Sequence, residues 1–406
     1  MNIMRPKHLR IPSIALAIVV SAPSVFSQTG TWVQRADFEG FARGDAAAFS
    51  IGGTGYVTTG GYVFQTMPND AGDTWAYNAA TNTWVQKADF GGGVRFAAAA
   101  FSINGIGYVV GGAQDGVVMS DLWAYDPVGD TWTQKASCPG TARSAAVAFS
   151  IGNTGYMGLG LDENANTLAD FWAYDPALDS WSQLNDMAGG ARAYAIGFSI
   201  GDKGYVGLGG AVSTYMNDFW EYDPVNDAWT ARASYPGVGR HSAIAFGTST
   251  TGYAGTGIGE SSILQDFYSY DPVSDTWTNL ADYPPGVRTS AAAFVINGSG
   301  YVVSGRGLLL DTYPDVWRYD PVVSTGIHDE NEASIALYPQ PAHDALHWTS
   351  PCPVLAEVLD LEGKRLFSTQ VSSGPVRLDL SNLPAGTYFL HTQEGIRQWS
   401  QLFVKE

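Results

Sequence analysis

The sequence predicts an all-β protein made of six repeated four-stranded units, followed by a second, smaller β domain. Glycine (48 residues) and Trp or Tyr (34 residues) are abundant, while charged residues make up only 15%. This composition is typical of strands and tight turns rather than helices. A Tyr-Asp-Pro segment also recurs at a nearly constant interval until Pro321, after which the pattern stops. Four strand-like pieces in each interval of about fifty residues indicate a six-bladed β-propeller.

Residues 1–27 differ from the rest of the chain and are typical of a secretory signal peptide. Three basic residues precede a short apolar core at residues 14–20 (IALAIVV), and Val25 and Ser27 then offer modest side chains before a cleavage site. We therefore expect the mature chain to begin at Gln28. No cysteine follows this point closely, which argues against a lipoprotein anchor, and no later apolar run is long enough to span a membrane.

Residues 28–321 contain the repeated units. In one unit the four pieces are Arg95 with an Ala-rich run, Gly107-Tyr with apolar residues, the segment from Asp121 to Tyr125, and a strand that starts at Trp132. Turns with Gly and Asn join the first two pieces, and D-P-x-x-D turns join the last two. The tyrosines of the third piece lie 48 or 49 residues apart, at Tyr77, Tyr125, Tyr174, Tyr222, Tyr270 and Tyr319.

The sixth unit has no fourth strand of its own. Its third piece ends at Tyr319, and no tryptophan follows where the other five units have one, at Trp84, Trp132, Trp181, Trp229 and Trp277. One spare fourth strand, Trp32-Val-Gln-Arg-Ala, stands directly after the expected signal peptide. We expect this N-terminal strand to complete the last blade, because that pairing removes the open edge of a linear array.

These units resemble kelch repeats over residues 31–321. The resemblance is carried by a glycine pair after an apolar strand and by a Tyr and a Trp seven residues apart. The pair is intact at Gly60-Gly61, Gly111-Gly112 and Gly209-Gly210, and altered in the other three units. The resemblance implies a six-bladed kelch propeller, in which the first strand of each blade is innermost.

After a linker at residues 322–331, residues 332–406 show alternating strands joined by glycine turns, which predicts an Ig-like β-sandwich of about seven strands. The order of segments resembles the C-terminal sorting domain of type IX secretion cargo. Tyr338-Pro-Gln-Pro departs from the family's Tyr-Pro-Asn-Pro only at Gln340, while Leu361-Glu-Gly-Lys, Leu383-Pro-Ala-Gly-Thr-Tyr and Phe403-Val-Lys match. An ordinary β-sandwich binding module is the alternative.

The resemblance to this sorting domain implies export through the periplasm and across the outer membrane by the type IX machinery. The mature protein is then secreted or held at the cell surface, and the sorting domain is removed. Two cysteines, Cys138 and Cys352, fall in different predicted domains, so we expect two unpaired, buried thiols rather than a disulfide.

Charge and residue content exclude several function classes. Three of the 21 basic residues and none of the 39 acidic residues lie in the first 27, so the mature chain carries a net charge of −21. Such a chain is repelled by nucleic acid and by anionic lipid. Some kelch propellers are copper galactose oxidases, but this propeller has a single histidine, His241, and a single cysteine. A copper or zinc site cannot be built from them, so we expect no metal, no cofactor and no catalytic residue set of a known type.

Arginine is the strongest candidate for ligand binding. Six arginines precede the first strand of each unit and would surround one mouth of the central channel: Arg43, Arg95, Arg143, Arg192, Arg240 and Arg288. They could present paired donors to a carboxylate or sulfate group. The structural alternative is ion pairing between blades with six aspartates at matched positions: Asp73, Asp121, Asp170, Asp218, Asp266 and Asp315.

His241 is the other candidate, because no other unit has a histidine at this position. Asp162, Glu163 and Glu260 lie in loops whose sequences vary from unit to unit, where a calcium ion or an acid–base pair could be held, or where they could simply be solvated. We expect a monomeric binding module for an extracellular glycan or protein. The rival is a metal-independent enzyme, since similar six-bladed kelch propellers include sialic acid mutarotases; a structural surface protein is a third reading.

Overall fold

The computed structural model describes residues 30–64, 67–211, 214–307, 311–321, 337–338, 341–350, 353–360, 364–394 and 397–406. The chain divides between Val322 and Val323 into two compact units, each of which is described by itself. The expected signal peptide, the expected linker and Cys352 lie outside the described residues. Strands, turns and bridges account for the regular structure in the described ranges, which hold no helix long and apolar enough to cross a membrane.

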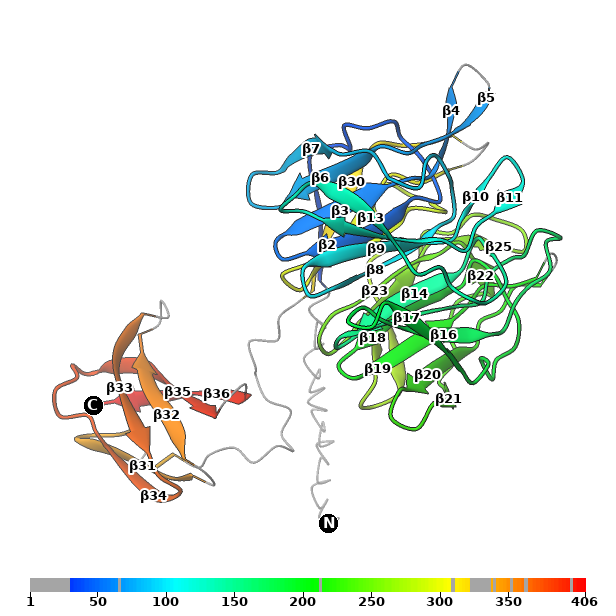
Figure 1. Cartoon of the computed structure of the whole chain (residues 1–406). Helices are drawn as coiled ribbons and strands as arrows, with labels where there is room; N and C mark the ends of the chain where they lie inside the picture. Colours follow the sequence, from blue (N-terminus) through cyan, green and yellow to red (C-terminus); the bar gives the residue numbers. More distant parts are fainter. Residues whose placement is uncertain are drawn as a thin grey trace, which may run out of the picture. The chain divides into compact units, whose positions relative to one another are not determined.

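The first unit consists of six antiparallel four-stranded sheets, here called blades I to VI, which are visible as the large body in Figure 1. Their strands, from innermost to outermost, are as follows: blade I, β2 (Ala47–Ile51), β3 (Thr54–Thr58), β6 (Thr74–Asn78) and β7 (Thr83–Lys87); blade II, β8 (Ala99–Ile103), β9 (Ile106–Val110), β12 (Leu122–Asp126) and β13 (Thr131–Lys135); blade III, β14 (Val147–Ile151), β15 (Thr154–Gly158), β16 (Phe171–Asp175) and β17 (Ser180–Leu184); blade IV, β18 (Ile196–Ile200), β19 (Lys203–Gly207), β20 (Phe219–Asp223) and β21 (Ala228–Arg232); blade V, β23 (Ile244–Gly247), β24 (Gly252–Gly255), β26 (Phe267–Asp271) and β27 (Thr276–Asn279); blade VI, β28 (Ala292–Ile296), β29 (Ser299–Val303), β30 (Val316–Asp320) and β1 (Thr31–Gln34).

The innermost strands form a closed ring. β2, β8, β14, β18, β23 and β28 contact one another in that cyclic order, and β28 returns to β2. The predicted all-β propeller is therefore confirmed. Its fourth blade-VI strand is β1, which pairs with β30 in antiparallel register, with Trp32 opposite Tyr319. The Trp32 ring lies 4.9 Å from the ring of Phe267 and 4.9 Å from that of Tyr319. The N-terminal strand thus supplies the tryptophan that the sixth repeat lacks.

Packing between blades explains the recurring Gly-Tyr pair at the start of each second strand. At Gly107, a Cβ atom would overlap the ring of Phe49, which comes from the first strand of the preceding blade. The same holds at the other five positions: Gly55, Gly155, Gly204, Gly252 and Gly300. Phe49 also stacks on Tyr56 of its own blade with ring centroids 5.2 Å apart. Glycine is required because an aromatic side chain fills the space between neighbouring blades.

The Tyr-Asp-Pro-x-x-Asp-x-Trp segment joins neighbouring blades in a different way. The hydroxyl of Tyr125 donates to Asp130, and the same carboxylate accepts the backbone N–H of Ala88, which follows the outer strand of blade I. The indole of Trp132 donates to the carbonyl of Ala88. Side chains of one motif therefore supply hydrogen-bond partners for the backbone groups at the end of the preceding blade. This gives a physical reason for the repetition of the motif.

One face of the propeller carries the longer connections, and we call it the loop face. The segments that lead into each innermost strand open on it, as do the connections between second and third strands. The connections between second and third strands include the short pairs β4 (Gly61–Phe64) with β5 (Met67–Asp70) and β10 (Ala113–Gln114) with β11 (Val117–Val118), which project from the ring in Figure 1. On the same face, β22 (Arg240–His241), in the segment that leads into β23, pairs with β25 (Ile258–Gly259), in the connection between β24 and β26.

The second unit has two antiparallel sheets in its described residues. One sheet is β33 (Arg365–Val371), β32 (Val354–Leu359), β35 (Gly386–Glu394) and β36 (Arg397–Lys405), and the other is β31 (Ala345–Ser350) with β34 (Gly374–Asp379). Side chains of both sheets, among them Trp348, Val358, Leu378 and Phe403, share one buried core. These six strands form a small β-sandwich; an Ig-like strand order stays a prediction.

Candidate functional site

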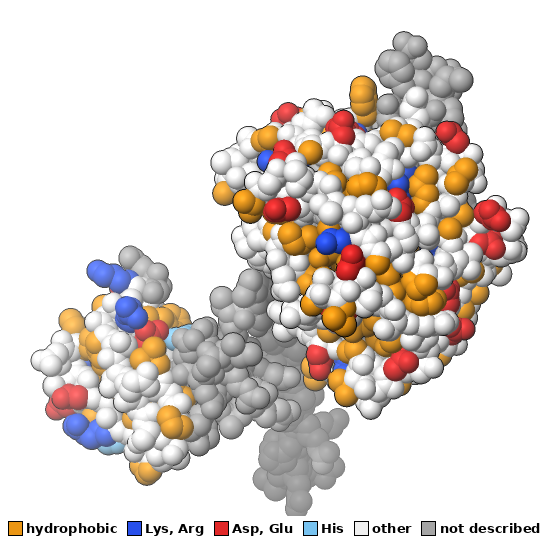
Figure 2. Space-filling view, viewed as in Figure 1, with side chains coloured by type: hydrophobic (Ala, Val, Ile, Leu, Met, Phe, Trp, Pro, Cys, Tyr) orange, Lys and Arg blue, Asp and Glu red, His pale blue; other side chains and the backbone are white. Residues whose placement is uncertain are grey.

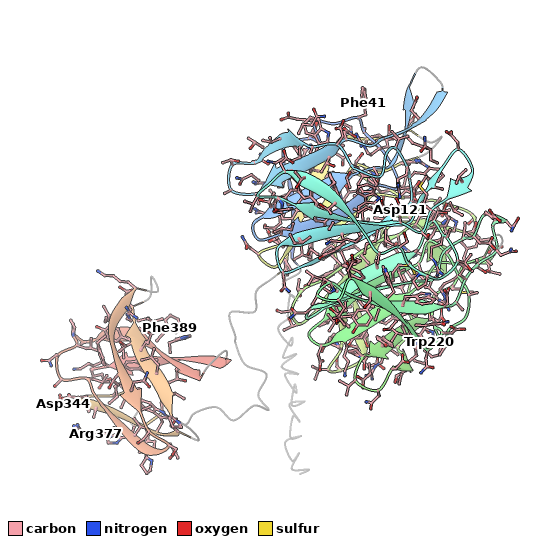
Figure 3. The ribbon with its side chains drawn as sticks, viewed as in Figure 1. Phe41, Asp121, Trp220, Asp344, Arg377 and Phe389 are labelled. Atoms are coloured by element: carbon pink, nitrogen blue, oxygen red, sulfur yellow. The ribbon has the colours of Figure 1, made fainter. Side chains whose placement is uncertain are left out.

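The six arginines of the loop face are buried and paired. Each is at most 2% exposed, and each guanidinium holds the carboxylate of the matched aspartate with two hydrogen bonds. The shortest N–O distances are 2.5 to 2.8 Å in five pairs, Arg43–Asp73, Arg95–Asp121, Arg143–Asp170, Arg192–Asp218 and Arg288–Asp315, and Arg240 pairs with Asp266 in the same way. Asp121, labelled in Figure 3, belongs to this set.

These ion pairs form within a blade, not between blades as expected. Arg95 precedes β8 and Asp121 precedes β12, and both strands belong to blade II. The link to the preceding blade is made instead by the arginine backbone. The N–H of Arg95 donates to Ala71, and its carbonyl accepts from Gly60, both in the blade I loop. Each arginine therefore ties its own blade through the side chain and its neighbour through the main chain.

In four of the six pairs, a tryptophan donates a further hydrogen bond to the aspartate. The indoles of Trp75, Trp123, Trp172 and Trp220 donate to Asp73, Asp121, Asp170 and Asp218 at 2.6 to 2.7 Å; Trp220 is labelled in Figure 3. Burial by itself would raise the pKa of Asp73, Asp170 and Asp218. Hydrogen bonds and charge from the paired arginine, together with the tryptophan N–H, outweigh burial and hold these pKa values below the ordinary range.

The arginine side chains do not line the channel mouth. The residues two positions further on do, and we call them the inner ring: Asp45, Ala97, Ala145, Tyr194, Ser242 and Ser290. All six have left-handed backbone conformations with φ between 52° and 57°, which costs energy for residues other than glycine. The backbone N–H of each donates to the carbonyl of the preceding member at 2.8 to 3.0 Å, and the six bonds close a circle. The strained conformation is thus held by a hydrogen-bonded ring.

The inner ring surrounds a cavity of about 130 Å³. It opens into a channel cavity of about 200 Å³ that is lined by the small residues of the innermost strands, such as Ala46, Ala98 and Gly197. Small side chains are needed there because six strands converge on the axis. The polar groups that could select a ligand therefore lie at the mouth rather than in the channel.

Residues that break the repeat gather at this mouth. Arg306, from the blade VI loop, lies 3.2 Å from the carboxylate of Asp45 and donates to the carbonyl of Gly61 at 3.4 Å. The His241 ring stacks on Tyr215 with centroids 5.3 Å apart and lies 5.7 Å from the Tyr194 ring. Phe96 and Leu161 pack on Ala97, Ala145 and Ala193. We call Asp45, Tyr194, Tyr215, His241 and Arg306 the mouth cluster.

The mouth cluster is half-buried, and burial shifts the pKa values of two of its members. Burial lowers the pKa of the His241 imidazole below its ordinary value, although the charge of Asp45 acts in the opposite direction. The imidazole is therefore neutral at pH 7, and its Nδ1 lies 3.0 Å from the hydroxyl of Ser242. Burial and the Asp45 charge raise the pKa of the Tyr194 hydroxyl, while Arg306 opposes them. One neutral base, one phenol and one ion pair thus share a single mouth.

The candidate site residues predicted from the sequence lie in different parts of the structure. His241 lies in the mouth cluster, whereas the six repeated arginines lie outside it, and ligand binding by them stays a prediction. Glu163 and Glu260 are exposed. Asp162 accepts hydrogen bonds from the backbone of Asn164 and Asn166, and the described residues contain no group of His, Cys, Asp and Glu able to hold a metal ion.

Sequence reasoning missed Asp45, Tyr194, Tyr215 and Arg306 as site residues. A signal was present, since each occupies a position at which the repeats differ. Cys138 is buried and unpaired as expected, and burial raises the pKa of its thiol to about 11, so it is unreactive at neutral pH.

Comparison with known proteins agrees with this architecture. Residues 95–139 match the kelch motif, and residues 336–406 match the secretion system C-terminal sorting domain. The solved structure of YjhT is similar to 70% of this chain and 95% of its own, with a TM-score of 0.60 and 16% sequence identity, a likeness of fold alone. No curated protein matches by sequence. The sorting domain indicates export by type IX secretion to the cell surface or the extracellular space.

Proposed function

We propose that this exported kelch propeller is a binding protein whose ligand, a glycan, docks on the mouth cluster of the loop face. The observation that carries the proposal is convergence. Residues from blades I, IV, V and VI that do not follow the repeat meet at one mouth, while residues that do follow it are buried in the scaffold. Positions that vary among repeats are where specificity can lie, because the repeated ones are committed to folding.

The chemistry of the mouth cluster fits a sugar ring. Two tyrosine rings and an imidazole offer flat apolar faces, against which the C–H groups of a sugar can stack. Arg306 supplies N–H donors, and Asp45 supplies an acceptor, at the edge of the cavity. The cavity inside the inner ring measures only about 130 Å³, so a sugar would rest on the mouth cluster above it and not enter it. An extracellular protein would have to bind across the wider loop face, which the experiment below tests.

The experiment is a glycan-array screen of the full chain, followed by affinity measurements on Arg306→Ala and Tyr215→Ala. We expect a glycan to bind and each variant to weaken binding about tenfold, by loss of a charge-assisted hydrogen bond or of a stacking face. Arg365→Ala is the matched control. It removes the same charge as Arg306→Ala, but from a side chain of the other unit that is 62% exposed. Binding to an extracellular protein, with no glycan bound, would overturn the proposed ligand class.

A metal-independent sugar-modifying enzyme is the second candidate, because one observation favours it. The charge of Asp45 acts on the neutral imidazole of His241, which lies beside the Tyr194 ring. A base, His241, and a proton donor, Tyr194, therefore converge at the mouth. An enzyme of this kind would speed the interconversion of the two anomers of a carboxylated sugar, which NMR exchange measurements detect. Rate enhancement that disappears in His241→Gln would favour the enzyme over a simple binding protein.

A further inference from the structure

Blade VI departs from the other blades at one backbone position. Three residues before the repeated arginine, blades I to V have glycine, at Gly40, Gly92, Gly140, Gly189 and Gly237. Blade VI has Pro285 there. The segments Tyr235-Pro-Gly-Val-Gly-Arg and Tyr283-Pro-Pro-Gly-Val-Arg have equal length, so the change replaces a residue and does not shift the register.

Glycine at this position is required by its close neighbours. A Cβ atom on Gly140 would lie 2.7 Å from the indole nitrogen of Trp172 and 2.8 Å from Nη2 of Arg143. In blades I, II and IV a Cβ would come within 2.6 to 2.8 Å of the equivalent indole nitrogen. Any side chain there collides with a tryptophan that is docked on its aspartate. In blade V, which keeps Gly237 but has Tyr268 in place of the tryptophan, a Cβ would meet Arg240 and Tyr235 instead, so the glycine makes room for the arginine as well as for the tryptophan.

With proline in place, blade VI has lost the tryptophan–aspartate bond. The indole nitrogen of Trp317 is buried and has no hydrogen-bond partner, unlike its four equivalents. Nε of Arg288 is buried without a partner as well, but so is Nε of Arg95 in blade II, where the tryptophan is docked on its aspartate, so the Trp317 nitrogen alone distinguishes blade VI from blades I to IV. A buried N–H without an acceptor costs about 1–3 kcal/mol. The Trp317 N–H is therefore a donor for which blade VI supplies no acceptor.

Both residues line a cavity of about 340 Å³, which is larger than the cavity at the mouth. Its other lining includes Pro285, Gln34 and Asp37 from the N-terminal segment, and Tyr313. The Tyr313 ring lies 4.6 Å from the Arg288 guanidinium carbon and is 39% exposed. The volume is at the lower end of the ~300–1,000 Å³ found for small-molecule sites, the size of a single small ring compound.

We propose that this blade VI cavity is a second binding site, separate from the mouth cluster, and that it takes one neutral sugar residue. The Trp317 N–H has no acceptor within the protein, and the carboxylate of Asp37 and the amide of Gln34, which also line the cavity, can accept from hydroxyl groups. A sugar hydroxyl both donates and accepts, so one ring can satisfy both sets. The exposed face of Tyr313 supplies a stacking surface.

The charges favour a neutral ligand over an anion. Asp315 already neutralises Arg288 through two hydrogen bonds, and Asp37 adds a further negative charge at the rim. A carboxylated or sulfated sugar would meet a net negative site in a strongly acidic chain, which disfavours its binding. The repeated arginine thus offers the ligand no net charge here.

NMR of the indole N–H groups of the full chain tests the proposal, with Trp317 assigned by Trp317→Phe. Glucose, galactose, mannose and N-acetylglucosamine are the probes, with glucuronate as the charged counterpart. We expect at least one neutral sugar to shift the Trp317 signal. Its affinity, measured by calorimetry, should fall about fivefold in Trp317→Phe, as loss of one hydrogen bond implies. The unfolding midpoint should hardly change, because no internal bond is lost.

Two further variants separate a binding role from a structural one. Pro285→Gly restores the residue of the other blades, so Trp317 should dock on Asp315, its N–H should become protected from exchange, and sugar binding should disappear. Trp172→Phe removes a donor that does have an acceptor; it should lower the unfolding midpoint and leave sugar affinity unchanged. The proposal is overturned if no neutral sugar shifts Trp317, if glucuronate alone does, or if binding survives Pro285→Gly.

Discussion

The Arg–Asp pairs and the mouth cluster lie on the same face, and Asp45 and Tyr194 are each only two residues from a paired arginine, yet the two groups follow opposite rules. The pairs recur in all six blades and their arginines are at most 2% exposed. The mouth cluster recurs in none, and its Arg306 is 28% exposed. Repetition at this face marks what the ring needs in order to close. Departure from the repeat marks where the chain is free to contact something else.

A second contrast separates blade VI from blades I to IV. In the latter, the aspartate holds both the arginine and a tryptophan, and the glycine leaves room for them. In blade VI, proline replaces the glycine, and the unit opens into a cavity. Both contrasts lead to the same rule, since a position that breaks a strict structural repeat requires either a compensating contact or an outside partner. The predictions below test this rule, beginning with the largest effect.

Removing an arginine from a repeated pair should cost the most. We expect Arg143→Ala to lower the free energy of unfolding by about 3–5 kcal/mol, because Asp170 is left half-buried without its cation. Arg306→Ala is the matched variant at the mouth and should cost less, because the Arg306 side chain is 28% exposed and gives up fewer buried contacts than that of Arg143, which is 1% exposed. Denaturation followed by tryptophan fluorescence reports on the propeller, which holds 11 of the 13 tryptophans. Equal losses in the two variants would contradict the division into scaffold and site.

Adding a single methyl group to a repeat glycine should have the next largest effect. We expect Gly140→Ala to cost about 1–3 kcal/mol, because its Cβ would push Trp172 and Arg143 off Asp170. Gly53→Ala is the control, since nothing lies within 4 Å of a Cβ at that turn. In Gly140→Ala the Trp172 indole N–H should also exchange faster with solvent than in the native chain. A neutral Gly140→Ala would remove the physical basis of the blade VI cavity.

Much of the scaffold could be predicted from the sequence, because it repeats. The strand pattern, closure by Trp32 and the pairing of six arginines with six aspartates all follow from matching spacings. Whether each pair forms within one blade or between two blades could not be predicted, since spacing fixes the register of a residue and not the direction of its side chain. The left-handed residue two positions after each arginine turns the chain, so inner-ring residues face the axis and the arginines do not.

The mouth cluster and the blade VI cavity could not be predicted, for a related reason. Arg306 and Asp45 are more than 250 residues apart and meet only when the ring closes. Pro285 stands in a turn where proline is unremarkable by local rules. Its effect appears only against five glycines at the same register, and only because a tryptophan from another strand occupies the space. Surface acidity, by contrast, was predictable, and Figure 2 shows acidic side chains spread over the propeller face in view.

The acid dependence of stability should sharpen the comparison between blades. In blade III the folded-state pKa of Asp170 is lowered, so its contribution is present above the ordinary carboxyl pKa of about 3.9 and is lost as pH falls through the folded value. At pH 7, Trp172→Phe should cost about 1.5 kcal/mol, as a hydrogen bond to a charged group does. That cost should shrink toward pH 2, because a protonated Asp170 is a weaker acceptor. Trp317→Phe should show neither the cost nor the pH dependence.

The smallest expected effect concerns His241. Because its folded-state pKa lies below the ordinary value, the unfolded chain takes up a proton first as pH falls through about 6.5. The free energy of unfolding should therefore decrease from pH 7 toward pH 5, and His241→Phe should show a shallower decrease. Urea midpoints at pH 7, 6 and 5 measure the difference. Asp45 and Arg306 face the same mouth, and His241→Phe leaves both in place, so the comparison isolates the imidazole. Parallel curves would mean that His241 is fully hydrated when folded, which would leave the mouth cluster without the neutral base that an enzymatic role requires.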